Sequence, residues 1–550
     1  MQNNLPIGID SFREIREECM YYVDKTLMIR DFIQYGDKVA LITRPRRFGK
    51  TLNMTMLREF FDITMDSKAI FDGLAIMDTE YANQINTRPV IFLSFKDCKA
   101  NTAESMVFAM NTIIMGEYAK YHAVLDGNIN ETLVCYRRFS MIFEMLVSGS
   151  ISMDFLQTSI VTLEQTLYEY YKIKPIVLID EYDQPIISSF EGGYHDEVKN
   201  FFSGMYGAAL KGQDCLHQAL LTGIQRVVKE SIFSQLNNIY VYTVTDARYS
   251  GYFGFTGDEA GKLLTSCGLE LSDPVKERYD GYIFGGVEVY NPWSILNYAK
   301  TGKLGDYWIN TSTNALVRDS LADADEFFLK YFDMLISDES VEVMADLTCS
   351  FIELKHNTSL WGLLINSGYL TIIEQADDMF MTVRIPNGEV RSEFVKIVAN
   401  RARVSDQDLQ MMFRCLFKKD MDGFMGIYQR LVISCTSYFD AKENAYHMLF
   451  LGMCITLRDI YRISSNIESG HGRSDILLES KDRERPHIII EFKQGEDIEA
   501  LKEEALQQIL DNRYYEWLSG EVLCMGVAHD KKRCALAHAT ISSRIALCMP

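Results

Sequence analysis

The chain has 550 residues, of which 47% are hydrophobic and 24% charged, a composition that excludes a disordered chain and predicts roughly three globular domains. The formal net charge of -21 argues against a broad nucleic-acid-binding surface but leaves room for a local basic groove. Twelve cysteines without a CxxC pair and nine histidines without zinc spacing predict reduced thiols and no zinc site. With neither a signal peptide nor an apolar run of about 18 residues, we expect a cytoplasmic protein that does not span a membrane.

The first predicted elements are a helix over 25–33, capped by Asp24, and a buried strand over 39–42. A basic loop follows, and a helical pattern begins at 52. The loop reads Arg44-Pro45-Arg46-Arg47-Phe48-Gly49-Lys50-Thr51.

A strand, a tight loop and a helix form the context of a phosphate-binding loop, because N–H groups at a helix N-terminus attract an anion. Lys50 would reach the β- and γ-phosphates of a nucleotide, and Thr51 would hold Mg²⁺. Arg44 stands where the GxxxxGK[ST] pattern has its first glycine, so this loop alone leaves an ordinary basic loop as an equal alternative. Tyr22 or Phe12, which precede the loop, would stack on adenine, although the core is the better-supported place for both rings.

Residues 52–87 have a helical pattern, 90–95 form a second predicted strand, and 102–172 are mainly helical. The run 175–181 then predicts a buried parallel strand that ends in Asp180 and Glu181. Asp180 would bind Mg²⁺ through water, and Glu181 would orient and deprotonate the attacking water. The loop and these acids together, in this order on an α/β pattern, favour a nucleoside triphosphatase.

Two further strands are predicted at 218–223 and 239–244. Ligands of open α/β sheets lie outside the carboxyl ends of the strands, so Thr222 and Arg226 would face the γ-phosphate. A solvated helix start is an equal alternative for Arg226.

Several segments together resemble a known family. They are 22–26 (YVDKT), 44–51 (RPRRFGKT), 179–183 (IDEYD), 222–224 (TGI), 233–238 (FSQLNN), 279–282 (YDGY) and 290–294 (YNPWS). The family is that of bacterial predicted AAA-type ATPases with a C-terminal PD-(D/E)XK-type nuclease domain, and the resemblance covers nearly the whole chain. In that family an arginine-rich loop stands in for the glycine-rich one, so Arg44 and Arg47 count as nucleotide-binding with Gly49, Lys50, Thr51, Asp180 and Thr222.

The resemblance implies an α/β fold with three parts: a P-loop AAA/RecA-like ATPase core over 1–265, a connector over 266–400 and a restriction-endonuclease-like domain over 401–550. The connector would contain a helical lid, with Pro292 in the first turn of a helix. A helix followed by short strands at 368–373 and 379–385 also fits a winged-helix-like module, for which packing is a better-supported role than DNA contact. Lys396, Arg401 and Arg403 form a basic patch or a solvated helix face.

The C-terminal part predicts helices over 405–435 and 443–458, strands over 461–467, 474–478 and 487–493, and a charged helix over 498–512. Glu491 and Lys493 are two apart on a strand, so they point to the same side. If Asp475 lies on the neighbouring strand, two carboxylates would bind Mg²⁺ and Lys493 would position the attacking water. An exposed ion pair and a turn-stabilising aspartate are the alternatives. By family position, Glu443 and Gln508 would complete the D…ExK site, with Glu468 competing for the place of Glu443.

Two functions follow. The first is an ATP- and Mg²⁺-dependent ATPase coupled to a metal-dependent DNA nuclease, suited to defence or mobile-element maintenance. The second is an ATPase switch whose C-terminal domain binds DNA or a protein without cleaving. DNA is favoured over RNA, and an arginine supplied by a neighbouring protomer would require a homo-oligomer. The catalytic set is Glu181, Asp475, Glu491, Lys493, Gln508 and Glu443, and the metal-binding set is Thr51, Asp180, Asp475 and Glu491.

Overall fold

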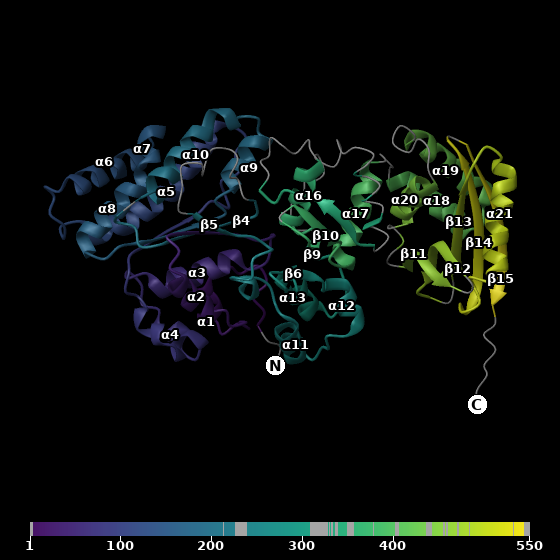
Figure 1. Cartoon of the computed structure of the whole chain (residues 1–550), viewed down its shortest axis with the longest axis horizontal. Coiled ribbons are helices and arrows are strands. Elements are labelled where there is room, and N and C mark those ends of the chain that lie inside the picture. Colours follow the sequence, from purple (N-terminus) through teal and green to yellow (C-terminus); the bar gives the residue numbers. More distant parts are fainter. Residues whose placement is uncertain are drawn as a thin grey trace. The chain divides into compact units, whose positions relative to one another are not determined.

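The computed structural model describes residues 4–212, 214–225, 239–308, 339–348, 357–377, 379–401, 406–435, 443–454, 460–469, 472–482, 485–531 and 533–543, together with residues 328, 331, 334, 335 and 457. The chain forms two compact units (Figure 1). Unit 1 comprises residues 1–325 and 340–389, and unit 2 comprises residues 326–339 and 390–550. The predicted boundaries at 265 and 400 remain predictions.

Unit 1 is built on a five-stranded sheet in which every neighbouring pair of strands is parallel. The strands, in spatial order, are β2 (Val90–Ser94), β3 (Ile176–Asp180), β4 (Ala219–Gly223), β1 (Val39–Thr43) and β5 (Ile239–Tyr242). Each lies on a run predicted as a strand, and the α/β class is confirmed. Strand β4 separates β1 from β3, so the phosphate loop after β1 and the acids that end β3 flank the carboxyl end of β4.

Helices cover both faces of this sheet, with α1–α4 on one side and α5–α10 on the other (Figure 1). The first group is α1 (Phe12–Glu17), α2 (Leu27–Tyr35), α3 (Lys50–Phe61) and α4 (Lys68–Phe71). The second group is α5 (Ala103–Leu125), α6 (Val134–Ser148), α7 (Met153–Gln157), α8 (Ser159–Tyr171), α9 (Gln184–Glu191) and α10 (His195–Leu210).

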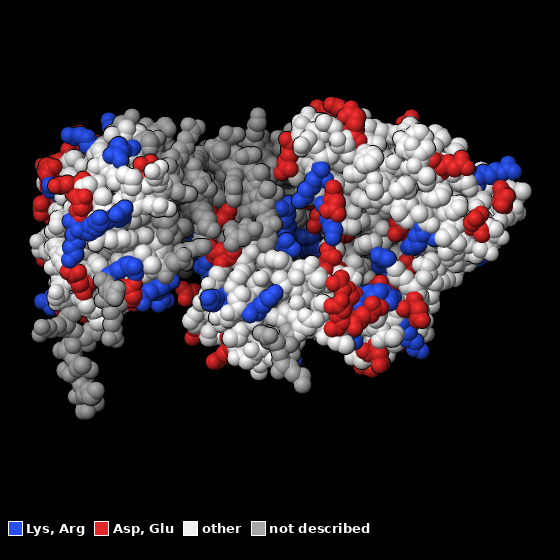
Figure 2. Space-filling view, turned by 180° about the vertical axis from the view of Figure 1, so that it is seen from behind, with Lys and Arg blue, Asp and Glu red and all other residues white. Residues whose placement is uncertain are grey.

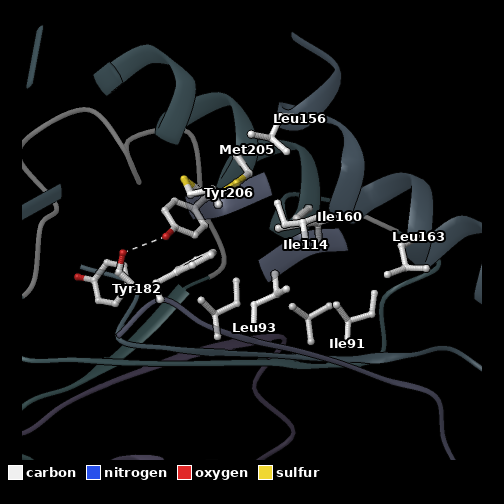
Figure 3. Packing of buried hydrophobic residues seen from close by; sticks show 14 of the residues in the cluster. Ile91, Leu93, Ile114, Leu156, Ile160, Leu163, Tyr182, Met205 and Tyr206 are labelled. Atoms are coloured by element: carbon white, nitrogen blue, oxygen red, sulfur yellow. Dashed lines mark hydrogen bonds between the residues drawn. The ribbon is translucent and has the colours of Figure 1, made fainter. Parts of the chain in front are cut away.

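The largest core lies between the sheet and the second group of helices. Figure 3 shows Ile91 and Leu93 of β2 facing side chains of α5, α7, α8 and α10, and all the residues it labels are buried. Truncating one such aliphatic side chain to alanine costs about 2–5 kcal/mol, because the cavity collapses only partly. The continuous apolar strands are what a parallel sheet covered on both faces requires.

Two predicted helices have different bounds in unit 1. Thr26, not Asp24, is the N-cap of α2, while the Asp24 carboxylate accepts from the backbone N–H and the hydroxyl of Thr26. The helical pattern of 52–87 ends at Phe61, followed by α4 and two 3-10 helices, η1 (Ala75–Asp78) and η2 (Glu80–Gln84). Asp62 breaks the helix because its backbone is extended and its carboxylate accepts from the N–H of Thr64, a local bond that competes with helical ones.

The rest of unit 1 follows β5. Its elements are η3 (Ser250–Tyr252), α11 (Gly257–Ser266), α12 (Asp273–Tyr279), β6 (Tyr282–Phe284), β7 (Val287–Val289), α13 (Pro292–Thr301), β8 (Val341–Met344), α16 (Asn357–Asn366), β9 (Thr371–Gln375) and β10 (Phe380–Arg384). The helix start at Pro292 is confirmed, with Asn291 as N-cap. The predicted pair β9 and β10 is antiparallel, and β8 adds a third strand on the other side of β10.

Unit 2 is a second α/β layer structure. Its elements are α17 (Gly388–Arg401), α18 (Asp406–Phe417), α19 (Met421–Cys435), α20 (Glu443–Cys454), β11 (Tyr461–Ser469), β12 (Gly472–Ser480), β13 (His487–Gln494), α21 (Ile498–Asp511), β14 (Gly520–Asp530) and β15 (Arg533–Ser543). The five strands form one sheet in chain order, and only the β13–β14 pair is parallel. The three predicted strands are confirmed, and β14 and β15 were not predicted. The predicted helix over 443–458 is described as α20 to Cys454, and residues 455, 456 and 458 lie outside the described residues. The side chain of Lys396, the backbone of Arg403 and the side chain of Arg401 lie outside the described residues.

Candidate functional sites

The basic loop between β1 and α3 has two residues in the left-handed backbone region. These are Arg47, with φ of 68°, and Gly49, with φ of 84°, which caps the N-terminus of α3. A Cβ on Gly49 would meet no atom within 4 Å, so the backbone angle and not space favours glycine. Arg47 adopts that region with a side chain, a strained conformation that is common at functional sites. The first N–H groups of a helix have no partner within it, so the start of α3 can receive an anion, as the motif predicts.

Lys50 is buried within the loop. Its ammonium donates to the carbonyl oxygens of Arg44 at 2.9 Å and Pro45 at 2.8 Å. Burial lowers the pKa of Lys50, and the charges of Glu181, Asp183 and Asp180 oppose that effect. A cation whose partners are neutral carbonyls is available to an anion of high charge that enters the loop.

Asp180 is fully buried, and its two carboxylate oxygens are held by hydroxyl groups from separate elements. Thr51 donates to Oδ2 at 2.8 Å and Thr222 donates to Oδ1 at 2.7 Å. Ser94 of β2 adds a longer bond of 3.4 Å to Oδ2. The predicted metal-binding pair, Thr51 and Asp180, is therefore brought into direct contact. Thr222 lies behind Asp180 and orients that carboxylate.

Glu181 also has a left-handed backbone, with φ of 50°. The next residue, Tyr182, fixes this turn. Its carbonyl accepts from Tyr206 Oη at 2.9 Å (Figure 3). The Tyr182 hydroxyl donates to the Gln225 carbonyl at 2.6 Å. Burial raises the pKa of Glu181; Lys50 opposes this, while Asp180 adds to the increase. A carboxylate with a raised pKa is suited to take a proton from water.

The loop opens into a cavity of about 430 Å³ in unit 1. Of the predicted nucleotide-site residues, those that line it are Arg47, Gly49, Lys50, Thr51 and Glu181. Asp180, Thr222 and Arg44 lie outside its wall, and Arg226 lies outside the described residues. Tyr22 lines the cavity, whereas Phe12 is fully buried. The volume falls within the range of ligand pockets.

Arg44 is fully buried below the loop. Its guanidinium lies over the rings of Phe253 and Phe284, at 5.5 and 5.3 Å from their centroids, and donates to the carbonyls of Thr43 and Tyr242. Burial lowers the pKa of Arg44 to about 10. The Arg44 side chain therefore packs against the later part of unit 1, and its backbone carbonyl is the part that reaches the site.

Sequence reasoning assigned no site role to several residues of the cavity wall, among them Trp293, Lys96 and Gln184. Trp293 is the second residue of α13, and the Arg47 guanidinium stacks on its ring at 4.2 Å. Two features of the sequence could have indicated these residues. Trp293 lies in the Asn291-Pro292-Trp293 segment, and Lys96 comes just after strand β2, at the sheet edge where ligands bind.

A second group of polar side chains lies in unit 2, where β12 pairs with β13. The pairing Ile476↔Ile490 makes Asp475 and Glu491 opposite neighbours. The Asp475 N–H donates to Glu491 Oε2 at 3.3 Å, and the Asp475 carboxylate accepts from the Phe492 N–H at 2.7 Å. Burial raises the pKa of Asp475, and the hydrogen bond from Phe492 and the charge of Lys493 oppose that effect.

Two other predicted residues join this pair. Gln508 of α21 donates its amide N–H to Glu491 Oε1, and the Lys493 ammonium is 4.0 Å from the same oxygen. Glu443 begins α20, but its side chain and that of Glu468 lie outside the described residues. Among the side chains that the structure describes, no three His, Cys, Asp or Glu residues gather as a metal site. Asp475 and Glu491 supply the hard oxygen atoms that Mg²⁺ prefers.

Two family models match parts of this chain. Residues 6–233 match the family model described as "Predicted AAA-ATPase", and residues 441–539 match the model described as "PD-(D/E)XK nuclease superfamily". The first match contains the phosphate loop, Asp180 and Glu181, and the second contains Asp475, Glu491, Lys493 and Gln508.

Two individual proteins are also similar. A curated protein of Azotobacter chroococcum mcd 1, described as "Uncharacterized protein in vnfD 5'region", is 26% identical over 541 residues, which is 93% of each chain. A solved structure of the Aeropyrum pernix ORC2 protein in ADPNP–ADP complexes covers 73% of this chain and 96% of its own, with 11% identity and a TM-score of 0.25. Within the ranges that the structure describes, no helix has the length and apolar character needed to cross a membrane.

Proposed function

Since this chain carries a predicted AAA-ATPase domain and a domain of the PD-(D/E)XK nuclease superfamily, we propose that it hydrolyses ATP and cleaves DNA in a metal-dependent reaction. The observation that carries the ATPase half is the contact between Thr51 and Asp180 beside a buried Lys50, at the wall of a cavity of about 430 Å³.

ATP would place its phosphates against the N–H groups at the start of α3, with Lys50 on the β- and γ-phosphates. Thr51 and, through water, Asp180 would hold Mg²⁺, which would neutralise part of the charge of the phosphates. Glu181 orients the attacking water and takes one of its protons. The new O–P bond forms as the bond from the γ-phosphorus to the β–γ bridging oxygen breaks.

In unit 2, Asp475 and Glu491 would hold Mg²⁺ beside a phosphodiester, and the ion would supply a Lewis acid for its cleavage. Lys493 lies close enough to the Glu491 carboxylate to face the same ion-binding space. Its ammonium positions the water and stabilises the negative charge that develops at phosphorus. Gln508 keeps Glu491 in place, as groups that bond to metal ligands commonly do.

The substrate of unit 2 would be DNA in preference to RNA, in a cytoplasmic role such as defence or mobile-element maintenance. Figure 2 shows basic and acidic side chains intermixed over the face in view, so nucleic-acid contact would depend on local groups. ATP binding would regulate cleavage, and a homo-oligomer would be needed if a neighbouring protomer supplies an arginine.

A second candidate is an ATPase switch whose unit 2 binds DNA or a protein without cleaving. Two observations on Asp475 favour it. One carboxylate oxygen of Asp475 accepts a hydrogen bond from the Phe492 N–H. Burial also raises the pKa of Asp475, which opposes the ionised form that a metal needs.

The test is cleavage of plasmid and single-stranded DNA by the full chain with Mg²⁺ or Mn²⁺, with and without ATP. Lys493→Ala should lose cleavage and keep ATP hydrolysis, whereas Lys50→Ala should lose ATP hydrolysis. Lys419→Ala is the matched control, because Lys419 forms an exposed ion pair with Glu521 in the same unit.

Cleavage that disappears in Lys493→Ala and changes with ATP would support the gated nuclease. ATP hydrolysis without cleavage under any condition would favour the switch. Unchanged ATP turnover in Lys50→Ala would contradict the ATPase assignment.

A further inference from the structure

Lys96 lies in the wall of the cavity, outside the motifs that define the phosphate loop. It follows β2, whose last residue, Ser94, pairs with Asp180. The backbone N–H of Phe95 donates to the Asp180 carbonyl at 2.9 Å. These bonds place Lys96 at the carboxyl edge of the sheet, beside the strand end that carries Asp180 and Glu181.

The ammonium of Lys96 is bound by an acid from the N-terminal segment. Its Nζ is 2.9 Å from Asp10 Oδ2, and the two side chains are 45% and 50% exposed. Such an exposed ion pair stabilises a fold little, so breaking it costs little free energy when a stronger anion binds Lys96. Asp10 also lines the cavity, so both members of the pair face the space that a nucleotide would enter.

The backbone of Asp10 is anchored to the helix of the phosphate loop. Its carbonyl accepts from Thr55 Oγ1 at 2.9 Å, and the N–H of Phe12 donates to the same hydroxyl at 3.1 Å. Thr55 is one helical turn after Thr51, so the two lie on one face of α3. These bonds hold the backbone of Asp10 beside the helix that carries Thr51.

Asp10 acts on two cations of the cavity wall. Its hydrogen bond is the main cause that raises the pKa of Lys96. Burial lowers the pKa of Arg47, and the charges of Glu181 and Asp10 oppose that effect. The carboxylate thus provides, in the nucleotide-free chain, the negative charge that a terminal phosphate would provide in the bound state.

We propose that Lys96 binds the γ-phosphate of the nucleotide, and that Asp10 holds the Lys96 ammonium until the triphosphate takes the place of the Asp10 carboxylate. This rests on the proposed ATPase function. Charge that spreads over the γ-phosphoryl oxygens during hydrolysis is stabilised by positioned cations, and Lys96 supplies one from within the same chain.

The experiment measures, by calorimetry with Mg²⁺, the affinity of the full chain for ADP and for a non-hydrolysable ATP analogue with an imido β–γ bridge. The variants are Lys96→Met, Lys96→Arg and Asp10→Asn. Lys199→Met is the matched control, since Lys199 forms a surface pair with Asp196 at 2.6 Å.

Lys96→Met should weaken binding of the analogue about 10-fold or more and change ADP binding less than about 2-fold, as expected for one lost charge-assisted bond to the terminal phosphate. Lys96→Arg should recover part of the loss. Asp10→Asn should tighten binding of the analogue, because the competing carboxylate charge is gone.

Equal losses of ADP and analogue binding would show a general structural role and overturn the inference, as would an unchanged affinity for the analogue. If Lys96→Met is unfolded by circular dichroism, the Asp10→Asn result decides, and an unchanged or weaker affinity there overturns it. Wild-type protein that binds neither nucleotide would overturn the proposed ATPase function as well.

Discussion

The hydroxyl of Thr51 donates a hydrogen bond of 2.8 Å to Oδ2 of Asp180, although 129 residues separate them in the chain. Thr222 holds the other oxygen of the same carboxylate at 2.7 Å. Asp180 therefore has a fixed orientation before any ligand arrives, which is the preorganisation that electrostatic catalysis requires.

The first prediction concerns that orientation. Thr222→Val removes one donor while keeping the side-chain shape, so Asp180 should lose its alignment and ATP hydrolysis should fall by about 10-fold or more, with a higher Mg²⁺ requirement. Turnover measured across a Mg²⁺ titration checks this. Thr166→Val, which removes another buried hydroxyl far along the chain in α8, controls for a general loss of stability. Equal turnover in Thr222→Val and wild type would contradict the role.

The second prediction concerns Glu181. The pKa of Glu181 is raised, mainly by burial. As the pH falls, this carboxylate is therefore protonated at a higher pH than an ordinary glutamate, whose pKa is about 4.3. The wild-type turnover number should therefore show an acidic limb, and Glu181→Gln should keep ATP binding while losing about 10²–10⁴-fold in turnover. A pH–rate profile of both proteins checks this. Residual Glu181→Gln activity that keeps the same acidic limb would assign the limb to another group.

The third prediction uses two adjacent residues of α21. Gln508 donates to Glu491, whereas Gln507 is exposed and donates to Asp511 at 2.6 Å. Gln508→Ala should lower metal-dependent DNA cleavage by about 10–100-fold, because Glu491 loses its support, and Gln507→Ala should leave it unchanged. Plasmid nicking at several Mn²⁺ concentrations separates weaker metal binding from slower cleavage. Equal effects of the two changes would argue against a specific role for Gln508.

The fourth prediction concerns acid stability. His529 is fully buried between Tyr428 and Tyr446, and burial lowers the pKa of His529 to about 3. In the unfolded chain this histidine takes up a proton near about pH 6.5. Burial of the neutral imidazole therefore costs no stability above that pH. Between that pH and pH 3 the free energy of unfolding falls by up to about 1.4 kcal/mol per pH unit.

Thermal unfolding of unit 2 should therefore shift to lower temperature as the pH falls below about 6.5, and His529→Gln should weaken that dependence. The exposed His538 on β15 provides the control substitution His538→Gln. An identical pH dependence in wild type and His529→Gln would show that other groups control acid unfolding.

The chemistry at the ends of elements could be predicted from the sequence. Lys50 and Thr51 follow a strand and a short loop, Asp180 ends a strand, and Glu491 and Lys493 share one strand, so local pattern and sheet geometry together place them. The strands β14 and β15 were missed, although the run 522–528 is apolar and could have been identified as a strand.

Contacts between distant segments could not be predicted. Nothing local indicates that Thr222 supports Asp180, that Trp293 stacks on Arg47, or that Asp10 meets Lys96, because tertiary packing alone brings these segments together. Helix length was also overestimated between 52 and 87, where side chains such as that of Asp62 bond to the backbone and compete with helical hydrogen bonds.

The buried guanidinium of Arg44 limits which side chains position 44 can accept. The rings of Phe253 and Phe284 have packed around it, and its backbone does not use the left-handed region that only glycine adopts freely. Arg44→Gly would empty a space the size of a long side chain and give no conformational benefit. A chain with glycine at position 44 would need other side chains around that space, at positions more than 200 residues away, and a pattern search that requires glycine there passes over this loop.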